Sequence, residues 1–117
     1  MALLTVFTPT YNRAHTLPRT YQSLCRQECK DFVWLVVDDG STDGTADLVR
    51  SWQQEAKGFE IRYLYKENGG MHTAHNTAYE NIDTELNVCI DSDDYMTDDA
   101  VEKIDVMDIL MTATKQP

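Results

Sequence analysis

The sequence contains no long apolar run and no cluster of basic residues, and each absence excludes a class of protein. A membrane-spanning helix needs about 20 consecutive apolar residues, and the start of the chain lacks the basic region of a signal peptide. We therefore expect a cytoplasmic protein, either free or peripheral at the inner face of a membrane. Lys and Arg number 10 against 20 Asp and Glu, a net charge of −10. Because nucleic-acid binding depends on neutralising phosphates, this charge argues against a nucleic-acid partner.

Cysteine is also scarce. Cys25, Cys29 and Cys89 form an odd set without a C-x-x-C pair, which fits reduced thiols better than a disulfide framework. Cys25 and Cys29 are spaced to share a helix face, but no further Cys or His nearby completes a metal site. We expect Cys25 and Cys29 to be small buried apolar residues.

The 117 residues, 42% of them apolar, are enough for one domain with its own core. Short β-prone runs alternate with segments of helical length, which predicts an α/β fold with a parallel sheet, right-handed crossovers and helices on both faces. A proline, Pro9, is expected to end the first strand. We expect strands at 3–7, 32–37, 60–65 and 86–90, and helices at 16–27, 43–56, 71–81 and 98–111.

The loops that follow the strands carry the unusual residues. In a parallel sheet these loops emerge at one edge, where open α/β sheets bind their ligands. The four loops, at residues 8–13, 38–41, 66–70 and 91–94, are polar, and as a group they contain glycines, at 38–41 and 66–70, and many carboxylates, mostly at 38–41 and 91–94. Neither a G-x-G-x-x-G fingerprint nor a Walker loop is present, so a phosphate-cradling loop is not expected. The sequence therefore predicts a binding site of another kind at this edge.

Two adjacent acids, Asp38 and Asp39, follow the second strand. Gly40 suits the turn, and Ser41 or Asp43 is expected to cap the next helix. A turn does not require a second acid, so we assign Asp39 to binding. A carboxylate repels anions, and the expected partner offers hydrogen-bond donors such as a pyrimidine N–H or sugar hydroxyls.

A second acidic cluster, Asp91-Ser92-Asp93-Asp94, follows the fourth strand. Carboxylates this close repel one another unless a cation lies between them, and a hard divalent ion with oxygen ligands is the usual solution. The cluster predicts Mg²⁺ or Mn²⁺. Such an ion would also let an acidic protein bind a diphosphate.

The remaining candidates are weaker one by one. Tyr11 and Arg13 suit stacking on a base and pairing with an anion. His72 and His75 open the third helix, where they serve either in chemistry or in packing. The backbone N–H groups of residues 68–70 offer a hydrogen-bonding surface at the start of the same helix.

Taken together, these loops resemble glycosyltransferase family 2, the inverting nucleotide-sugar transferases of the GT-A fold, over about residues 3–104. The matching segments occur in order along the chain: Thr8-Pro9-Thr10-Tyr11-Asn12-Arg13, residues 37–45 (VDDGSTDGT), Asn68-Gly69-Gly70 with Ala74-His75-Asn76, and Asp91-Ser92-Asp93-Asp94. The resemblance implies a Rossmann-like three-layer sandwich with a mainly parallel sheet of about four βα units.

The resemblance also implies roles for individual residues. Asp39 would accept the pyrimidine N–H in a nucleobase pocket that comprises Thr8, Tyr11, Arg13 and Asp39. Asp91 and Ser92 would contact ribose and diphosphate, and Asp93 of the D-x-D motif would bind the metal. The floor near the donor would be shaped by Asn68, Gly70 and Asn76.

Members of this family continue well past the D-x-D motif, so we expect residues 1–117 to be the donor-binding portion, with the acceptor half and the general base beyond Pro117. The implied reaction transfers a sugar, most plausibly from a uridine diphosphate sugar, to a hydroxyl of a saccharide or lipid-linked saccharide. An uncovered flank of the sheet would favour a homo-oligomer, aggregation or a low melting temperature. Two alternatives stay open, a nucleotidyltransferase and a non-catalytic nucleotide-binding module.

Overall fold

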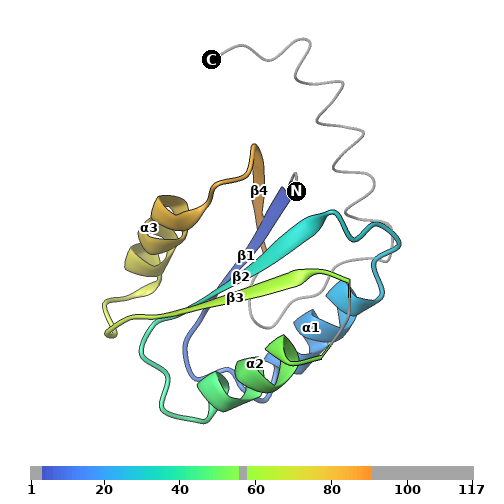
Figure 1. Ribbon diagram of the computed structural model, residues 1–117. Helices are drawn as coiled ribbons and strands as arrows, with labels where there is room; N and C mark the ends of the chain where they lie inside the picture. The colour runs from blue at the N-terminus through green and yellow to red at the C-terminus, as the bar shows by residue number, and fades with distance from the viewer. Residues whose placement is uncertain (1–3, 56–57, 91–117) are drawn as a thin grey trace.

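The computed structural model describes residues 4–55 and 58–90. Its elements alternate along the chain as β1 (Leu4–Thr10), α1 (Leu17–Cys25), β2 (Phe32–Asp38), α2 (Thr45–Gln53), β3 (Glu60–Tyr65), α3 (Met71–Asn81) and β4 (Leu86–Cys89). The four strands form one parallel sheet in the order β3-β2-β1-β4 (Figure 1). The predicted α/β class with a parallel sheet is therefore confirmed. The helix expected at 98–111 lies outside the described residues.

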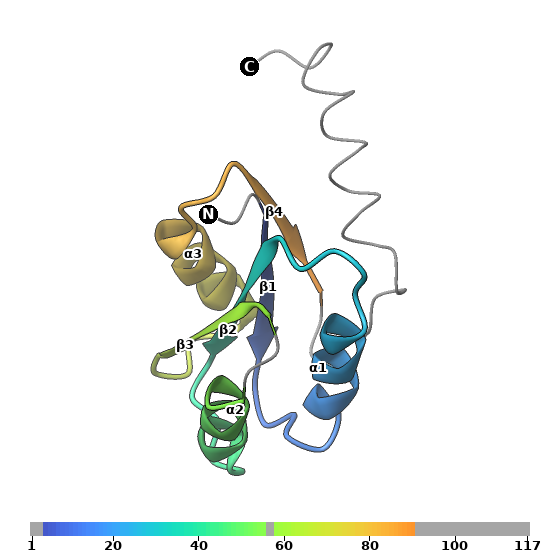
Figure 2. The same ribbon diagram turned by 45° about the vertical axis from the view of Figure 1, so that its right-hand side comes forward.

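The helices divide between the two faces of the sheet. From β1 the chain moves outward to β2 and β3, and it then returns across both to place β4 on the other side of β1. Right-handed crossovers in opposite directions lie on opposite faces, so α1 and α2 share one face and α3 covers the other (Figure 2). The direction of the strand order thus changes beside β1, and such a switch point is where ligands bind in open α/β sheets.

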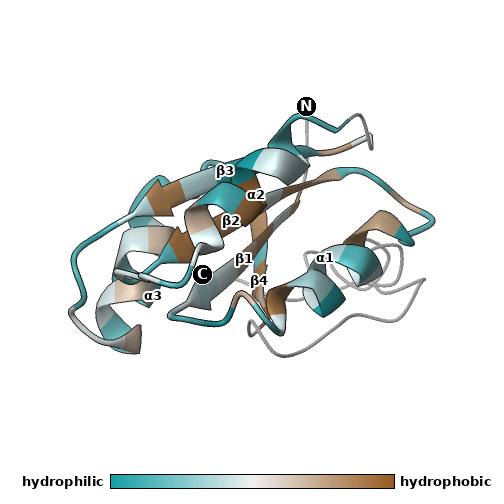
Figure 3. Cartoon of the chain, turned by 90° about the horizontal axis from the view of Figure 1, so that it is seen from below, coloured by the Kyte–Doolittle hydropathy of each residue, from teal (hydrophilic) through white to brown (hydrophobic). Residues whose placement is uncertain are grey.

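The two faces have cores of different size. The α1–α2 face is aromatic, with Tyr21 stacked on Trp52 at a ring separation of 4.1 Å and facing Trp34 at 6.0 Å. The α3 face is smaller, and Phe7 packs there with two alanines of the helix, Ala74 and Ala78. In the hydropathy-coloured view the apolar residues concentrate on the strands between the helices (Figure 3). The larger core therefore holds α1 and α2, and small side chains let α3 approach the sheet closely.

Strand burial follows position in the sheet. Every residue of β1 and β2 is buried, as expected for central strands covered on both faces. β3 is mostly half-buried or exposed and stands at an edge of the described sheet, which confirms the prediction that it lies nearer an edge. Its bounds, Glu60–Tyr65, are those expected from the sequence.

The prediction that Pro9 ends the first strand is wrong, because β1 continues through it to Thr10. Backbone groups alternate sides along a strand. The Phe7 carbonyl accepts the Ile90 N–H on the β4 side, and the Thr10 carbonyl accepts the Asp39 N–H on the β2 side. Pro9 is two residues after Phe7, so its nitrogen lies on the same side of the strand as that of Phe7 and faces away from β2. On that side the last described pair of β1 with β4 is Phe7 with Cys89, and Pro9 lies beyond it.

Other boundaries differ by a few residues, since α1 and α2 are shorter than expected and α3 has the predicted bounds. Cys25 and Cys29 are half-buried against the larger core, so their expected burial is partly confirmed, and Cys89 is exposed on edge strand β4. None of the three cysteines forms a disulfide. Within the described residues no helix is long and apolar enough to cross a membrane.

Candidate functional site

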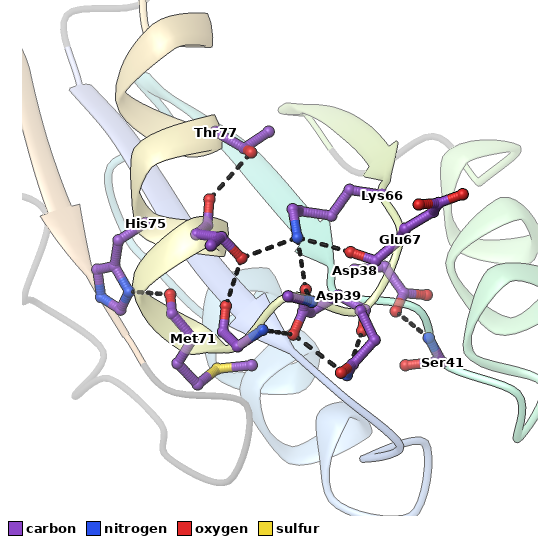
Figure 4. Close-up of polar contacts among 12 residues, drawn as sticks. Asp38, Asp39, Ser41, Lys66, Glu67, Met71, His75 and Thr77 are labelled. Atoms are coloured by element: carbon purple, nitrogen blue, oxygen red, sulfur yellow. Dashed lines mark hydrogen bonds and ion pairs between the residues drawn. The ribbon is translucent and has the colours of Figure 1, made fainter.

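The loops after β1, β2 and β3 meet at the carboxyl edge of the sheet, as the sequence predicts. Two backbone hydrogen bonds extend the strand pairing by one residue at this edge. The Thr10 carbonyl accepts the Asp39 N–H at 2.8 Å, and the Asp38 carbonyl accepts the Lys66 N–H at 2.9 Å. The strand register places Asp38 beside Tyr65, so the next pair along the chain is Asp39 and Lys66. The close-up in Figure 4 shows these residues facing one another across the loops.

Side chains tie the β1 and β2 loops together. Asn12, the non-glycine residue with positive φ (52°) in the described chain, receives a hydrogen bond from Thr42 N at its Oδ1, and its own N–H donates to Ser41 Oγ, both at 2.8 Å. Asp43 accepts the Ala14 N–H at 3.0 Å. These contacts fix the loop that presents Tyr11 and Arg13.

The expected capping of the second helix is only partly as predicted. The N-cap residue of α2 is Gly44, and Ser41 is used by Asn12. Asp43 lies one residue earlier, and its Oδ1 accepts from the backbone N–H and the hydroxyl of Thr45. Burial acts to raise the pKa of the Asp43 carboxyl, but these hydrogen bonds and that from Ala14 outweigh it and lower the pKa.

Asp38 is a structural acid. It is fully buried, its Oδ1 accepts the Ser41 N–H at 2.8 Å, and its Oδ2 accepts the Tyr63 hydroxyl. Burial, followed by this bond to a carboxylate, raises the pKa of the Tyr63 phenol. Both oxygens of Asp38 are thus used to shape the turn after β2.

Asp39 is also buried, with 1% of its surface exposed, but it serves the neighbouring loop. Its Oδ1 accepts from Lys66 Nζ at 2.7 Å and Gly69 N at 3.0 Å, and its Oδ2 accepts from Gly70 N at 2.9 Å. Burial acts to raise the pKa of the Asp39 carboxyl, but the bonds from Lys66 and the two glycine amides outweigh it and hold the pKa below its usual value. Asp39 is therefore an ionised anchor for the β3–α3 loop.

Asn68 adds a weaker contact to the same carboxylate. Its side-chain amide lies 3.4 Å from Asp39 Oδ2 and 3.1 Å from the Asp39 carbonyl oxygen. The role of Asp39 toward a nucleobase stays a prediction. In this structure its oxygens are engaged by the chain itself.

Glycines allow the loops to approach this closely. A Cβ on Gly40 would lie 2.8 Å from Asn68 N, and a Cβ on Gly69 would lie 2.9 Å from Thr73 Oγ1 and 3.2 Å from Lys66 Nζ. Gly70 has φ of +97°, which side-chain-bearing residues rarely adopt. Gly40 and Gly69 are thus required because neighbouring atoms leave no room for a Cβ, and Gly70 is required by its backbone conformation.

The predicted base-pocket residues divide into buried and exposed groups. Thr8 is fully buried, and its hydroxyl accepts the Trp34 indole N–H at 2.9 Å, so any contact of Thr8 with a ligand would come from its backbone. Tyr11 is 43% exposed, and Arg13 is exposed beside it. Gly70 and the exposed Asn68 lie in the β3–α3 loop. Their roles toward a ligand stay predictions.

The helix that follows carries the predicted histidines. His75 Nδ1 lies 2.9 Å from the Met71 carbonyl oxygen, and its ring packs edge-on against Phe7, which favours the packing interpretation. Its Nε2 lies 3.6 Å from Cys89 Sγ. His72 and Asn76 are exposed on the same helix.

Lys66 and Thr73 are the residues of this network that the sequence reasoning did not single out. The signal for Lys66 was its position, because it directly follows β3, and β3 lies next to the strand whose end carries Asp38 and Asp39. Thr73, one turn into α3, offered no local signal.

The predicted metal and diphosphate residues, Asp91, Ser92 and Asp93, lie outside the described residues. Within residues 4–55 and 58–90, no three His, Cys, Asp or Glu side chains are grouped to hold a metal ion. A cavity of about 440 Å³ does exist, but it lies at the opposite, amino edge of the sheet, beside Lys30, Phe32, Phe59 and Arg62. It is not part of the carboxyl-edge site.

The chain is similar in sequence to known proteins. The family model described as Glycosyl transferase family 2 matches residues 5–104. A validoxylamine A glucosyltransferase of Streptomyces hygroscopicus subsp. jinggangensis is 46% identical over 74 residues, which is 62% of this chain and 17% of the relative. The chain spans from 14% to 40% of the length of the first curated relatives it matches.

Two solved structures share the fold. S. aureus TarS residues 1–349 in complex with UDP-GlcNAc has a TM-score of 0.81 and 27% identity, over 91% of this chain and 30% of that one. The mannosyltransferase PcManGT of Pyrobaculum calidifontis in complex with GDP-Man and Mn²⁺ has a TM-score of 0.73 and 32% identity, over 78% of this chain and 27% of that one. The GT-A, Rossmann-like architecture expected from the sequence is confirmed by these neighbours.

Proposed function

Since the chain belongs to glycosyl transferase family 2, we propose that the carboxyl edge of its sheet binds the nucleotide of a nucleotide-sugar donor. The observation that carries the proposal is the buried, ionised Asp39, held where the loops after β1, β2 and β3 meet at the carboxyl edge, one strand from the switch point beside β1. The complexes of similar proteins with UDP-GlcNAc and GDP-Man support a nucleoside diphosphate sugar as the ligand class.

Exposed side chains supply the proposed contacts. Tyr11, on a loop fixed by Asn12, presents an aromatic ring on which a base can stack. Arg13 offers a positive charge to a phosphate in a chain whose net charge is −10. Asp39, Asn68 and Gly70 line the neighbouring loop and would face the base. Thr8 would contribute its backbone.

The proposed reaction is transfer of the sugar with inversion. An acceptor hydroxyl oxygen forms a bond to the anomeric carbon, the bond from that carbon to the diphosphate oxygen breaks, and the hydroxyl proton passes to a general base. A divalent cation, Mg²⁺ or Mn²⁺, supplies charge neutralisation of a departing diphosphate when it is bound. Asp93 is the ligand we propose for it, with Asp91 and Ser92 contacting ribose and diphosphate.

Because the chain spans a minor part of its relatives, the proposal assigns donor binding to this chain and sugar transfer to a complete protein. The acceptor is proposed to be a hydroxyl of a saccharide or lipid-linked saccharide. The carboxylate that acts as base is not among the residues assigned here.

Calorimetric titration with UDP, GDP and ADP, each with Mn²⁺ and with chelator, tests the proposal. We expect UDP or GDP to bind, Tyr11→Ala to weaken binding about tenfold through lost stacking, and Arg13→Ala to weaken it by a similar factor. Arg50→Ala is the matched control, because it also removes one positive charge but from an exposed side chain of α2. No binding of any of these nucleotides with Mn²⁺ present would overturn the proposed function.

The metal is tested separately. Chelator should abolish diphosphate binding, and Asp93→Asn should remove the dependence on Mn²⁺. If Asp93→Asn binds UDP with an unchanged metal dependence, the assignment of Asp93 is wrong.

A further inference from the structure

Lys66 stands at the centre of the site, but it is arranged as a supporting residue. Its ammonium lies 2.7 Å from Asp39 Oδ1, 2.7 Å from the Glu67 carbonyl oxygen and 2.8 Å from Thr73 Oγ1. An ammonium has three protons, so these contacts use all of its donors. The side chain is only 19% exposed. Lys66 therefore has no N–H left to donate to a phosphate, although it carries a positive charge at a site proposed to bind a nucleoside diphosphate.

The contacts of Lys66 continue into a closed ring. Thr73 accepts from Lys66 and donates its own hydroxyl proton to the Gly70 carbonyl oxygen at 2.6 Å. The Gly70 N–H in turn donates to Asp39 Oδ2. The ring thus joins the end of β2, the end of β3 and the first turn of α3, and all three are visible around Lys66 in Figure 4.

The bonds to Asp39 are unequal. Lys66, Gly69 and Gly70 donate at 2.7, 3.0 and 2.9 Å, which are good hydrogen bonds. The Asn68 amide lies 3.4 Å from Oδ2, at the limit of a hydrogen bond, and Asn68 is exposed. The acceptor position on Oδ2 that faces Asn68 is therefore the one from which an incoming donor can displace its present partner.

We propose that Lys66 is a positioning residue that fixes the Asp39 carboxylate and the 68–70 loop, and that a nucleobase N–H replaces the Asn68 amide on Asp39 Oδ2. The replacement of the Asn68 amide by a nucleobase rests on the proposed function, whereas the positioning role of Lys66 does not. At Oδ2 the replacement gives up only a weak contact at 3.4 Å, which is separate from the bond of the Asn68 amide to the Asp39 carbonyl oxygen at 3.1 Å. A base with a ring N–H, such as uracil, satisfies it, whereas cytosine presents an unprotonated nitrogen that a carboxylate repels.

Amide hydrogen exchange without nucleotide tests the positioning role. The Gly69 and Gly70 amides are protected because they donate to Asp39. In Lys66→Met, which keeps the length of the side chain and removes its charge, we expect both amides to exchange at least about tenfold faster. Unchanged protection in Lys66→Met would overturn the positioning role.

Two further variants keep this experiment decisive. Thr73→Val removes one acceptor of Lys66 and leaves its charge, so it should move the same amides in the same direction by a smaller factor, and it serves if Lys66→Met does not fold. Lys30→Met is the matched control, because Lys30 also donates to two carbonyl oxygens, those of Cys25 and Gln27, but beside the amino-edge cavity. It should leave Gly69 and Gly70 unaffected.

Titration of UDP and CDP tests whether a base N–H replaces the Asn68 amide on Asp39 Oδ2. In Lys66→Met the affinity for UDP should fall about tenfold and the preference for UDP over CDP should shrink, as expected when an acceptor of charged hydrogen bonds is no longer fixed. An equal loss for both nucleotides would indicate a general structural role and overturn the proposal. Asn68→Ala should bind UDP more tightly, because its amide no longer competes for Asp39 Oδ2, and an unchanged or lower UDP affinity would overturn the replacement of Asn68 by the base.

The failure of this inference differs from failure of the proposed function. If the parent chain binds no nucleotide, the proposed function and the replacement of the Asn68 amide by a base fail together. Amide hydrogen exchange still decides whether Lys66 positions Asp39. If the parent chain binds UDP and Lys66→Met binds it equally well, only the inference fails.

Discussion

The two edges of the sheet place a cation among carboxylates in very different surroundings. At the carboxyl edge Lys66 bonds to Asp39, and the exposed fractions of their side chains are 19% and 1%. At the amino edge Arg62 pairs with Glu60 and Asp83, whose side chains are 58% and 69% exposed. Charges in water gain little from pairing, whereas a buried ion that loses its partner is costly. Only the buried pair can therefore hold a loop in one position.

The same difference extends to the backbone nearby. At the carboxyl edge backbone amides of Gly69 and Gly70 point at the buried carboxylate. At the amino edge Lys30 bonds to carbonyl oxygens at the end of α1 and the cavity stays lined by mixed polar and aromatic side chains. One edge is organised around a single charge, and the other is not.

The largest expected effect comes from Asp39→Ala, which would leave the Lys66 ammonium and two amides without their acceptor. We expect a loss of about 3–5 kcal/mol in the free energy of unfolding, the usual cost of breaking a buried pair. Urea denaturation measures it. UDP affinity should fall by about 1–3 kcal/mol among molecules that remain folded. A variant as stable as the parent chain would contradict the anchoring role.

Acid should weaken the carboxyl edge first. The pKa of Asp39 is lowered in the folded state, so the unfolded chain takes up its proton at a higher pH. The stability contributed by Asp39 is present above the pKa of the unfolded chain, about 4, and is lost as pH falls through the lower folded value. We expect this acid-dependent loss to be smaller in Asp39→Asn, measured by unfolding between neutral and strongly acidic pH. Identical pH profiles would show that Asp39 is not the group responsible.

Glycine substitutions compare the edges directly. Gly69→Ala places a Cβ against Thr73 and Lys66, so we expect a cost of about 1–3 kcal/mol together with weaker UDP binding. Gly58→Ala, near the amino edge, meets only ordinary contacts with Lys30 but has φ of +89°, and its cost of about 1–2 kcal/mol should leave UDP binding unchanged. Thermal unfolding and calorimetry of both variants separate strain from a disturbed site.

The smallest effect should follow Arg62→Ala. Its pairs with Glu60 and Asp83 are solvated, and pairs of this kind contribute about 0–1 kcal/mol. We expect a change in unfolding free energy within that range and no change in nucleotide affinity. A larger loss would mean that the amino edge is more organised than its exposure indicates.

Several features of the site followed from local sequence. Continuous apolar runs identified the buried strands, and their alternation with helices placed the polar loops at one edge. Asp39 was singled out because a turn does not need a second acid. Pro9 was misjudged because the rule that proline ends strands depends on which side its nitrogen faces, and that side is set by the neighbouring strand.

The sequence by itself determined the order of elements, the edge at which the loops meet and the resemblance to a transferase family, because these depend on periodicity and on motifs read within short segments. Only the tertiary structure decided which side chains bond to one another. Asp39 and Lys66 are 27 residues apart, Thr8 is turned to Trp34 rather than to the loop, and Thr73 closes the ring from a helix. Such choices depend on strand register and on which face of the sheet each helix covers. A side chain of Asp, Lys or Thr carries no local signal of either.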